Sequence, residues 1–190
     1  MSCFICTNRE FLQATFEHLP SKIIRHSRRV EAISELLAVQ VSAENVPNNL
    51  SGDSYKLAVS RGAYYHDIGT ILAGNEVEKR PEMSEKVLAG YWNIDPTMPF
   101  SRVIFETIRH QFERYDEAEN LPLHASIFSI ADTFDMFMLT SKSARRNFEA
   151  ASEYIHKNSG ILFHPDAVKC FDNAKLHLLY DDIWTDGREI

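Results

Sequence analysis

Residues 123–139 read LHASIFSIADTFDMFML, a stretch that is apolar on nearly every side of a helix. A helix without a polar face is buried inside a fold, because only the interior gives all of its sides apolar neighbours. Asp132 stands in this stretch with Asp135 one turn later, and a buried ionised carboxylate is costly unless a partner or a metal compensates its charge. We therefore expect a central, buried helix over residues 122–139 whose carboxylates have such partners.

The rest of the chain also has helical periodicity, with no convincing alternating strand and no internal repeat. Turn-forming residues gather at 47–49, 74–75, 95–96 and 158–160, where we expect breaks. The fold class that follows is all-α, a compact helical bundle. Besides the central helix, we expect helices at residues 9–18, 22–41, 54–67, 82–92, 99–113, 144–157 and 165–180.

Length and composition indicate a single domain over residues 1–190, with 44% hydrophobic residues and enough chain for a sizeable core. Within it, residues 1–20 are expected to be an N-terminal extension and residues 181–190 a polar tail whose Trp184 packs back onto the body. No apolar run approaches membrane-spanning length and the amino terminus lacks a signal-peptide pattern, so we expect a cytoplasmic protein without a membrane partner. The formal net charge of −7 argues against general nucleic-acid binding, which needs a basic surface, and the oligomeric state stays open.

A histidine interrupts the apolar side of the helix expected at residues 22–41. Its stripe consists of Ile23, Val30, Ile33 and Leu37. His26 lies three residues after the first of these and four before the second, so its imidazole is expected to face the interior. The arginines nearby are expected to point elsewhere; they are Arg25, Arg28 and Arg29.

His66 and Asp67 end the helix expected at residues 54–67, and Gly69 follows where a helix that ends in the left-handed conformation favours glycine. A carboxylate in the last turn faces the negative end of the helix dipole, which costs a few tenths to about 1 kcal/mol without a compensating cation. Asp67 is therefore expected to have a cation beside it.

Together these positions predict a metal site, although each has an ordinary structural interpretation when taken alone. A lone histidine on an apolar stripe is more often a hydrogen-bonded core residue, and an aspartate at a helix end is usually a cap. The conjunction of two imidazoles and two carboxylates supplies the nitrogen and oxygen ligands that suit a divalent transition metal. Iron, manganese, nickel and zinc all accept such a mixed set.

The order H…HD…D resembles the signature of the HD superfamily of metal-dependent phosphohydrolases. From about His26 to Phe171 the flanking sequence resembles the HD-GYP branch, the cyclic-di-GMP phosphodiesterases. The fragments that carry this resemblance are RHSRRVEAISELLA (25–38), AYYHDIG (63–69), ERYD (113–116), LPLHASIFSIADTFDMF (121–137) and NSGILFHPDAV (158–168).

The resemblance implies a helical bundle of the HD-domain type that holds one metal, with a second one allowed through His110. The implied metal ligands are His26, His66, Asp67 and Asp132. Of these, Asp67 and Asp132 are also the implied catalytic residues, since Asp67 matches the family's bridging ligand and Asp132 can orient the attacking water. Arg114 and Arg146 resemble family positions near the substrate phosphates.

The departures from the family pattern concern the substrate side of the site. Thr70 stands where the HD-x-GK motif has a lysine, so the cation that faces a substrate phosphate is missing, a loss that weakens turnover by about ten- to a hundredfold. The GYP segment is absent, because only residues 117–120 separate ERYD from LPLHAS. Gln111 and Phe112 occupy the places of two family histidines, so His110 serves as a ligand only if the register shifts.

Two functions follow from these features. The first is a metal-dependent phosphohydrolase that cleaves a phosphoester of a nucleotide or related small molecule by attack of metal-activated water on phosphorus. The alternative is a degenerate HD domain that binds metal or nucleotide without efficient turnover and works as a signalling or interaction module. The four retained ligands favour the first, and the lost substrate-facing parts favour the second.

Overall fold

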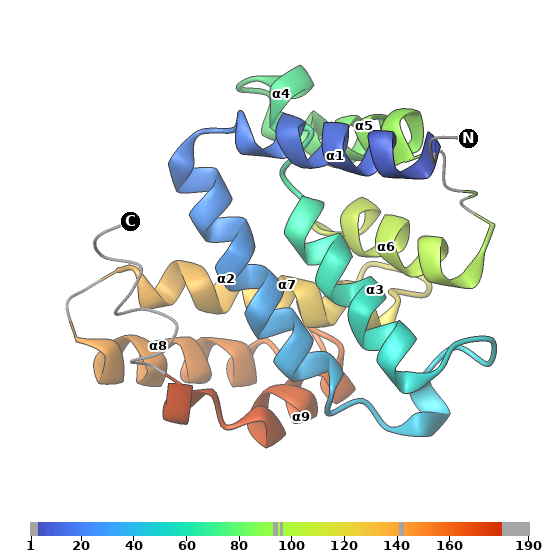
Figure 1. Ribbon diagram of the computed structural model, residues 1–190. Coiled ribbons are helices and arrows are strands. Elements are labelled where there is room, and N and C mark those ends of the chain that lie inside the picture. The colour runs from blue at the N-terminus through green and yellow to red at the C-terminus, as the bar shows by residue number, and fades with distance from the viewer. Residues whose placement is uncertain (1–3, 93–94, 96, 141–142, 180–190) are drawn as a thin grey trace.

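The computed structural model describes residues 4–92, 95, 97–140 and 143–179, and helices make up most of this part of the chain (Figure 1). Its α-helices are α1 Phe4–Glu17, α2 Ser21–Ala38, α3 Gly52–Tyr65, α4 Thr70–Ala73, α5 Arg80–Trp92, α6 Pro99–Arg109, α7 Leu123–Met138, α8 Ala144–Lys157 and α9 Pro165–Ala174. Short 3₁₀ helices cover Ala43–Asn45, Val77–Lys79 and Leu176–Leu179. Over the described residues no strand forms beyond one isolated bridge, Ser159 to Phe163, so the all-α prediction is confirmed. None of the described helices is both long and apolar enough to cross a membrane.

The central position of α7 is confirmed. This helix packs against α2, α6, α8 and α9, and Figure 1 shows it running behind α2 through the middle of the molecule. Ile127, Phe128, Ile130 and Phe134 are each at most 1% exposed, so α7 supplies much of the core. Most of its apolar circumference is explained by these neighbours, while the side with Asp132 and Met136 borders a cavity.

The remaining helices form two groups around this centre. In Figure 1, α1 and α5 lie side by side at the top, while α8 and α9 lie below α7. Between them, α2 packs on both α3 and α7, and α3 packs on α6. This arrangement brings the first half of α2 close to the end of α3, the start of α5 and the second half of α7.

Several helix ends differ from the expected ones. Ser51 caps α3, since its hydroxyl oxygen accepts a hydrogen bond from the Ser54 backbone N–H at 3.2 Å, and the helix therefore starts two residues early. The helix expected to reach residue 180 ends at Ala174, because Lys175 adopts the left-handed conformation with φ 49°. Residues 1–3 of the expected extension and the whole tail at 181–190, with Trp184, lie outside the described residues.

The expectation of a left-handed Gly69 is wrong. Its φ of −64° and ψ of −14° are right-handed, values that any residue adopts. A Cβ atom at this position would instead lie 2.3 Å from the Ser84 backbone nitrogen and 2.5 Å from the Arg80 carbonyl oxygen. Glycine is therefore required because the turn after α3 lies directly against α5.

Ser84 stabilises the contact between this turn and α5. Its hydroxyl accepts a hydrogen bond from the Gly69 N–H at 2.8 Å and donates one to the His66 carbonyl oxygen at 2.6 Å, with the side chain fully buried. Because His66 and Asp67 lie in the same turn, Ser84 fixes the backbone that carries two of the predicted ligands.

Ser84→Ala is expected to lower the free energy of unfolding by about 1 to 3 kcal/mol, because it leaves a buried N–H and a buried carbonyl without partners. Urea unfolding followed by circular dichroism measures the change. Ser129→Ala is the control, since the Ser129 hydroxyl donates only to the Ala125 carbonyl oxygen of its own helix, and it should change stability by less than about 0.5 kcal/mol. Equal stability of the two variants would contradict the role given to Ser84.

Candidate metal centre

The structure brings together four side chains that the sequence predicts as metal ligands. His26 comes from α2, His66 and Asp67 from the turn after α3, and Asp132 from α7. One potential ligand atom each of His26, His66 and Asp67 lies within 4.8 Å of the others. Asp132 joins them through its Oδ1, which lies 3.0 Å from His26 Nε2. Segments that are far apart in the sequence thus meet at one point.

His26 lies between two carboxylates of α7. Its Nδ1 is 2.8 Å from Asp135 Oδ2 and its Nε2 is 3.0 Å from Asp132 Oδ1. Burial by itself lowers the pKa of His26, but the hydrogen bonds and charges of the two carboxylates raise it to about 9. A metal would take the place of the Nε2 proton, while Nδ1–H remains on Asp135 and keeps the ring oriented.

His66 is oriented by its own helix. Its Nδ1 lies 2.7 Å from the Ala63 carbonyl oxygen, and because a carbonyl only accepts, Nδ1 carries the proton. Nε2 is then available as a ligand atom, 3.4 Å from Asp67 Oδ2. The ring is 3% exposed and packs on Phe128, with ring centroids 4.9 Å apart. Both histidines therefore present Nε2 toward the carboxylates of the site.

The expectation that Arg29 points away from this region is wrong. Its Nε donates to Asp135 Oδ1 at 2.6 Å and its Nη2 to Asp135 Oδ2 at 3.0 Å. The reason is helical spacing, since Arg29 follows His26 by three residues and shares its face of α2. Asp135 is fully buried; burial alone would raise the pKa of its carboxyl, but the hydrogen bonds from His26 and Arg29 lower it.

The two aspartates of α7 differ in burial from the expectation. Asp135 is the one at 0% exposure, whereas the Asp132 side chain keeps 31% of its surface exposed. Asp132 contacts His26 of α2 through Oδ1, and the rest of its carboxylate borders the open cavity. Asp135 therefore supports His26 from behind, and Asp132 remains accessible to a metal or a water molecule.

Asp67 has the cation that its position at a helix end predicts. Arg80, the first residue of α5, places Nη1 3.6 Å from Asp67 Oδ1. Burial alone would raise the pKa of Asp67, but the neighbouring His66, Arg80 and His26 lower it to about 2. The Asp67 carboxyl is therefore ionised at neutral pH and able to bind a metal.

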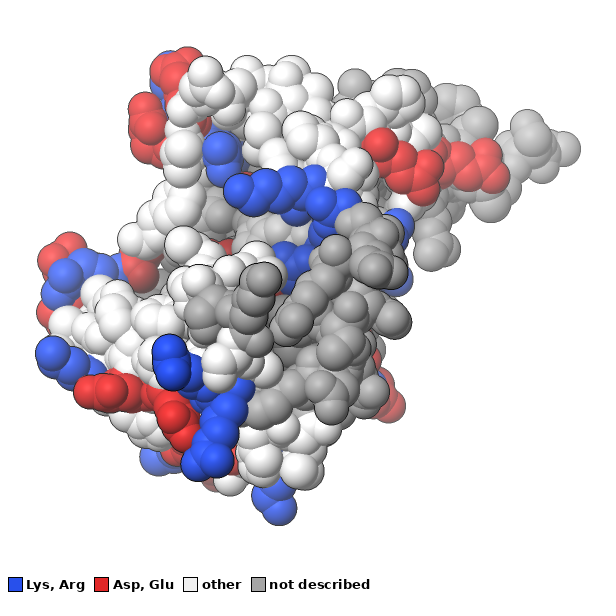
Figure 2. Space-filling model, turned by 90° about the vertical axis from the view of Figure 1, so that its left-hand side faces the viewer, with Lys and Arg blue, Asp and Glu red and all other residues white. Residues whose placement is uncertain are grey.

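These residues line a cavity of about 490 Å³. Three carboxylates in its wall, those of residues 67, 132 and 135, are matched by three cations, Lys22, Arg29 and Arg80. Its rim includes apolar side chains that are 44–63% exposed; these are Val77, Phe112, Met136 and Leu139. Figure 2 shows the side of the molecule at the left of Figure 1, where lysine and arginine side chains gather around a hollow. A divalent metal in place of the His26 proton would leave the cavity with a net positive charge, which attracts an anion.

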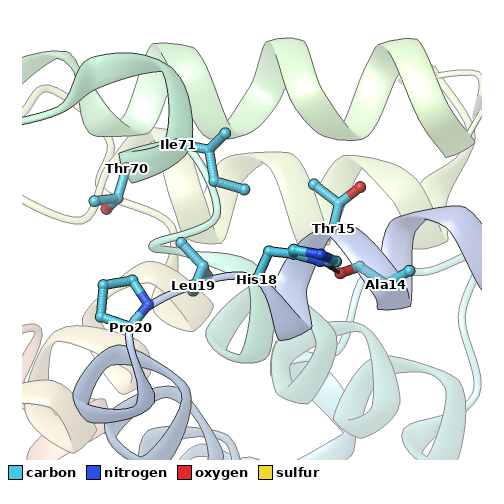
Figure 3. Close-up of a pocket in the computed structure, with 7 residues that line it drawn as sticks. All are labelled: Ala14, Thr15, His18, Leu19, Pro20, Thr70 and Ile71. Carbon is cyan, nitrogen blue, oxygen red and sulfur yellow. Dashed lines mark hydrogen bonds between the residues drawn. The ribbon is translucent and has the colours of Figure 1, made fainter.

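Thr70, the predicted substrate-binding residue, lies in a different cavity. That cavity measures about 540 Å³ and is bordered by the end of α1, the turn before α2 and the start of α4. Figure 3 shows Thr70 and Ile71 on one side of it and His18, Leu19 and Pro20 on the other. The structure therefore does not bring Thr70 to the wall that holds the four predicted ligands.

Three other predicted residues also lie outside the lining of the cavity that holds the ligands. His110 Nδ1 lies 2.8 Å from Glu113 Oε2. Arg114 forms ion pairs with Asp116 at 2.8 Å and Glu117 at 3.0 Å, and Arg146 is exposed on α8. Their roles as second-metal ligand and phosphate-binding residues stay predictions.

Sequence reasoning missed the cavity role of Arg80. Arg80 stands in EVEKRPEMSEK, a charged stretch that is typical of a solvated surface, and nothing local distinguishes it. Gln111 and Phe112 had a detectable signal, because they occupy the places of two family histidines, and both line the cavity.

A family model for the HD domain matches residues 23–136, a range that contains all four converging side chains. The chain belongs to the HD domain family. HD domains are typically metal-dependent phosphohydrolases, and the His26, His66 and Asp67 cluster of this HD domain is consistent with a metal site. A search among curated proteins found no match.

The donor set of this HD domain fits a divalent transition metal. Two imidazole nitrogens and two carboxylates are the ligand types of zinc, iron, manganese and nickel sites. The Asp135 carboxylate behind His26 and the Ala63 carbonyl behind His66 are the supporting partners that metal-bound histidines have in proteins. These partners are consistent with a metal site at His26, His66 and Asp67.

Proposed function

We propose that the chain is a metal-dependent phosphohydrolase that cleaves a phosphoester of a nucleotide or related small molecule. The proposal is supported by a single cavity whose wall contains both candidate metal ligands and positively charged side chains. His26, His66, Asp67 and Asp132 provide candidate metal ligands there, and Lys22 and Arg80 add positive charge that would attract a phosphate. A histidine cluster with only a structural role would not need positively charged side chains beside it.

In this proposal the four ligands hold one divalent metal. When bound, the metal makes a water molecule more acidic and polarises a phosphoryl oxygen. Asp135 and Arg29 keep the His26 ring in place from behind. Asp132, the most exposed of the carboxylates, orients the attacking water and is in position to accept its proton.

The substrate proposed here is a small phosphodiester with an apolar or aromatic group. The resemblance to the HD-GYP branch supports a phosphodiester, and the exposed apolar side chains at the rim offer a surface for the organic part of the substrate. The missing GYP segment removes one wall of the family's substrate site, so cyclic-di-GMP is a poor candidate for this chain.

The test combines metal analysis with hydrolysis assays. Protein reconstituted with iron, manganese, nickel or zinc should contain one or two metal equivalents and release p-nitrophenolate from bis(p-nitrophenyl) phosphate. Under the same conditions cyclic-di-GMP should be hydrolysed slowly or not at all. Metal-stripped protein and His66→Ala are the comparisons, and both should lack metal and activity.

Other results would point to different functions. Bound metal without hydrolysis of any phosphoester would favour the alternative of a binding or signalling module. Absence of metal after reconstitution would mean that the four ligands are relics. Rapid cleavage of cyclic-di-GMP would show that the missing segment is dispensable.

A further inference from the structure

Two residues of the cavity wall each carry a buried nitrogen donor that lacks a hydrogen-bond acceptor. Arg80 Nε and Gln111 Nε2 are both inaccessible atoms without a partner among the described residues. Both residues line the cavity that holds the predicted metal ligands. Since buried N–H groups almost always have an acceptor, two such donors on residues of one cavity wall point to an absent acceptor, which these side chains would reach by rotating toward the cavity.

Arg80 has further donors to offer. Its nearest anionic neighbour is Asp67, and the 3.6 Å from Nη1 to Oδ1 exceeds the length of a hydrogen bond. Its side chain is 24% exposed, so the guanidinium lies partly buried at the cavity, and its Nε has no acceptor among the described residues. Arg29, by contrast, donates hydrogen bonds from Nε and Nη2 to the two carboxylate oxygens of Asp135.

Gln111 complements this arrangement. The residue is 9% exposed, so its amide is held at the wall and is not a mobile surface group. A neutral amide N–H does not compete for the metal as a histidine would, yet it donates to an anionic oxygen. Guanidinium and amide donors beside a metal centre are suited to the tetrahedral oxygens of a phosphate.

We infer that Arg80 and Gln111 bind the phosphoryl oxygens of the substrate, with Arg80 as the residue that contributes most. The inference rests on the proposed function and assigns two residues to it. It also places the positively charged residue that binds the substrate phosphate on α5, close to the predicted metal ligand Asp67, and not at position 70, where Thr70 stands. Lys22, an exposed side chain of the same cavity, adds positive charge at the entrance.

The test measures binding of inorganic phosphate to the metal-loaded protein by isothermal titration calorimetry, which needs no turnover. Arg80→Gln is expected to weaken phosphate binding by about ten- to a hundredfold, because it removes charge-assisted hydrogen bonds. Arg80→Lys should recover part of this loss, since it keeps the charge without the planar fork. Gln111→Met should weaken binding by about two- to tenfold, the effect of one neutral hydrogen bond.

Arg109→Gln is the matched control. Arg109 pairs with Glu85 on the surface and is not part of the cavity wall, so the substitution removes the same group without changing phosphate affinity. Elemental analysis of each variant must show the metal content of the wild type.

Three outcomes would overturn the assignment. The first is absence of phosphate binding by the metal-loaded wild type, and the second is equal affinity in wild type and Arg80→Gln. The third is loss of metal together with phosphate in both Arg80 variants, because Arg80 would then act only by holding Asp67. Failure of the proposed function is a separate result, namely phosphate binding without hydrolysis of any phosphoester.

Discussion

Asp67→Ala is expected to lose bound metal and phosphodiesterase activity together. Asp67 lies between His66 and Arg80, and these neighbours lower the pKa of its carboxyl to about 2. Loss of a supporting group behind a ligand already costs about 10- to 100-fold in metal affinity or activity, so removal of the ligand itself should exceed a hundredfold. Elemental analysis and release of p-nitrophenolate measure the two effects on the same sample.

Asp53→Ala is the control for this substitution. The Asp53 side chain is 97% exposed in the first turn of α3, so its removal changes the net charge equally without affecting the cavity. Circular dichroism should show helical spectra for both variants, which separates loss of metal from loss of fold. Undiminished activity in Asp67→Ala would show that the metal site has been assigned wrongly.

The helical architecture could be anticipated from the sequence because its causes are local, whereas the convergence of the predicted ligands was implied by the resemblance to the HD superfamily. An all-round apolar stretch predicts a central helix, and His26 on an apolar stripe predicts an inward imidazole. Such patterns state which face of a helix is buried. They do not state which residue of the next helix meets that face, so the partnership of Arg29 with Asp135 needed the structure.

Gly69 also shows that local sequence patterns do not report tertiary contacts, in this case a contact of the backbone. Within the sequence, a glycine shortly after a helix indicates a left-handed cap, because that is the commonest local reason for glycine there. The actual reason is a tertiary contact with Ser84 of α5, which no local pattern reports. Arg80 was missed for a related reason, since it reaches Asp67 only because α5 lies against this turn.

The position of Arg80 in the cavity wall also changes the interpretation of Thr70. On the sequence alone, a threonine in place of the family lysine indicates a weakened phosphate site. In the structure, Thr70 lies at another cavity and Arg80 supplies a positive charge to the metal cavity from α5. A missing motif residue therefore does not by itself indicate a missing charge, because a neighbouring helix can provide it.

Gly69→Ala is expected to be the most destabilising single methyl addition among the glycines of the described residues. The added Cβ would lie 2.3 Å from a backbone nitrogen and 2.5 Å from a backbone carbonyl oxygen of α5, atoms that cannot rotate away as a side chain can. Overpacking usually costs about 1 to 3 kcal/mol, and this contact with rigid backbone should cost about 3 kcal/mol or more. Urea unfolding measures the loss.

Gly90→Ala separates this clash from a general effect of alanine. Gly90 lies in α5 with no heavy atom within 4 Å of an added Cβ, so alanine there should stabilise the protein by about 0.5 to 1 kcal/mol through helix propensity. In Gly69→Ala, by contrast, α5 must move away from the turn and carry Arg80 away from Asp67, so metal and phosphate affinity should fall along with stability. Unchanged stability in Gly69→Ala would show that α5 can move away from the turn at little cost. The close contact would then not be what positions Arg80 beside Asp67.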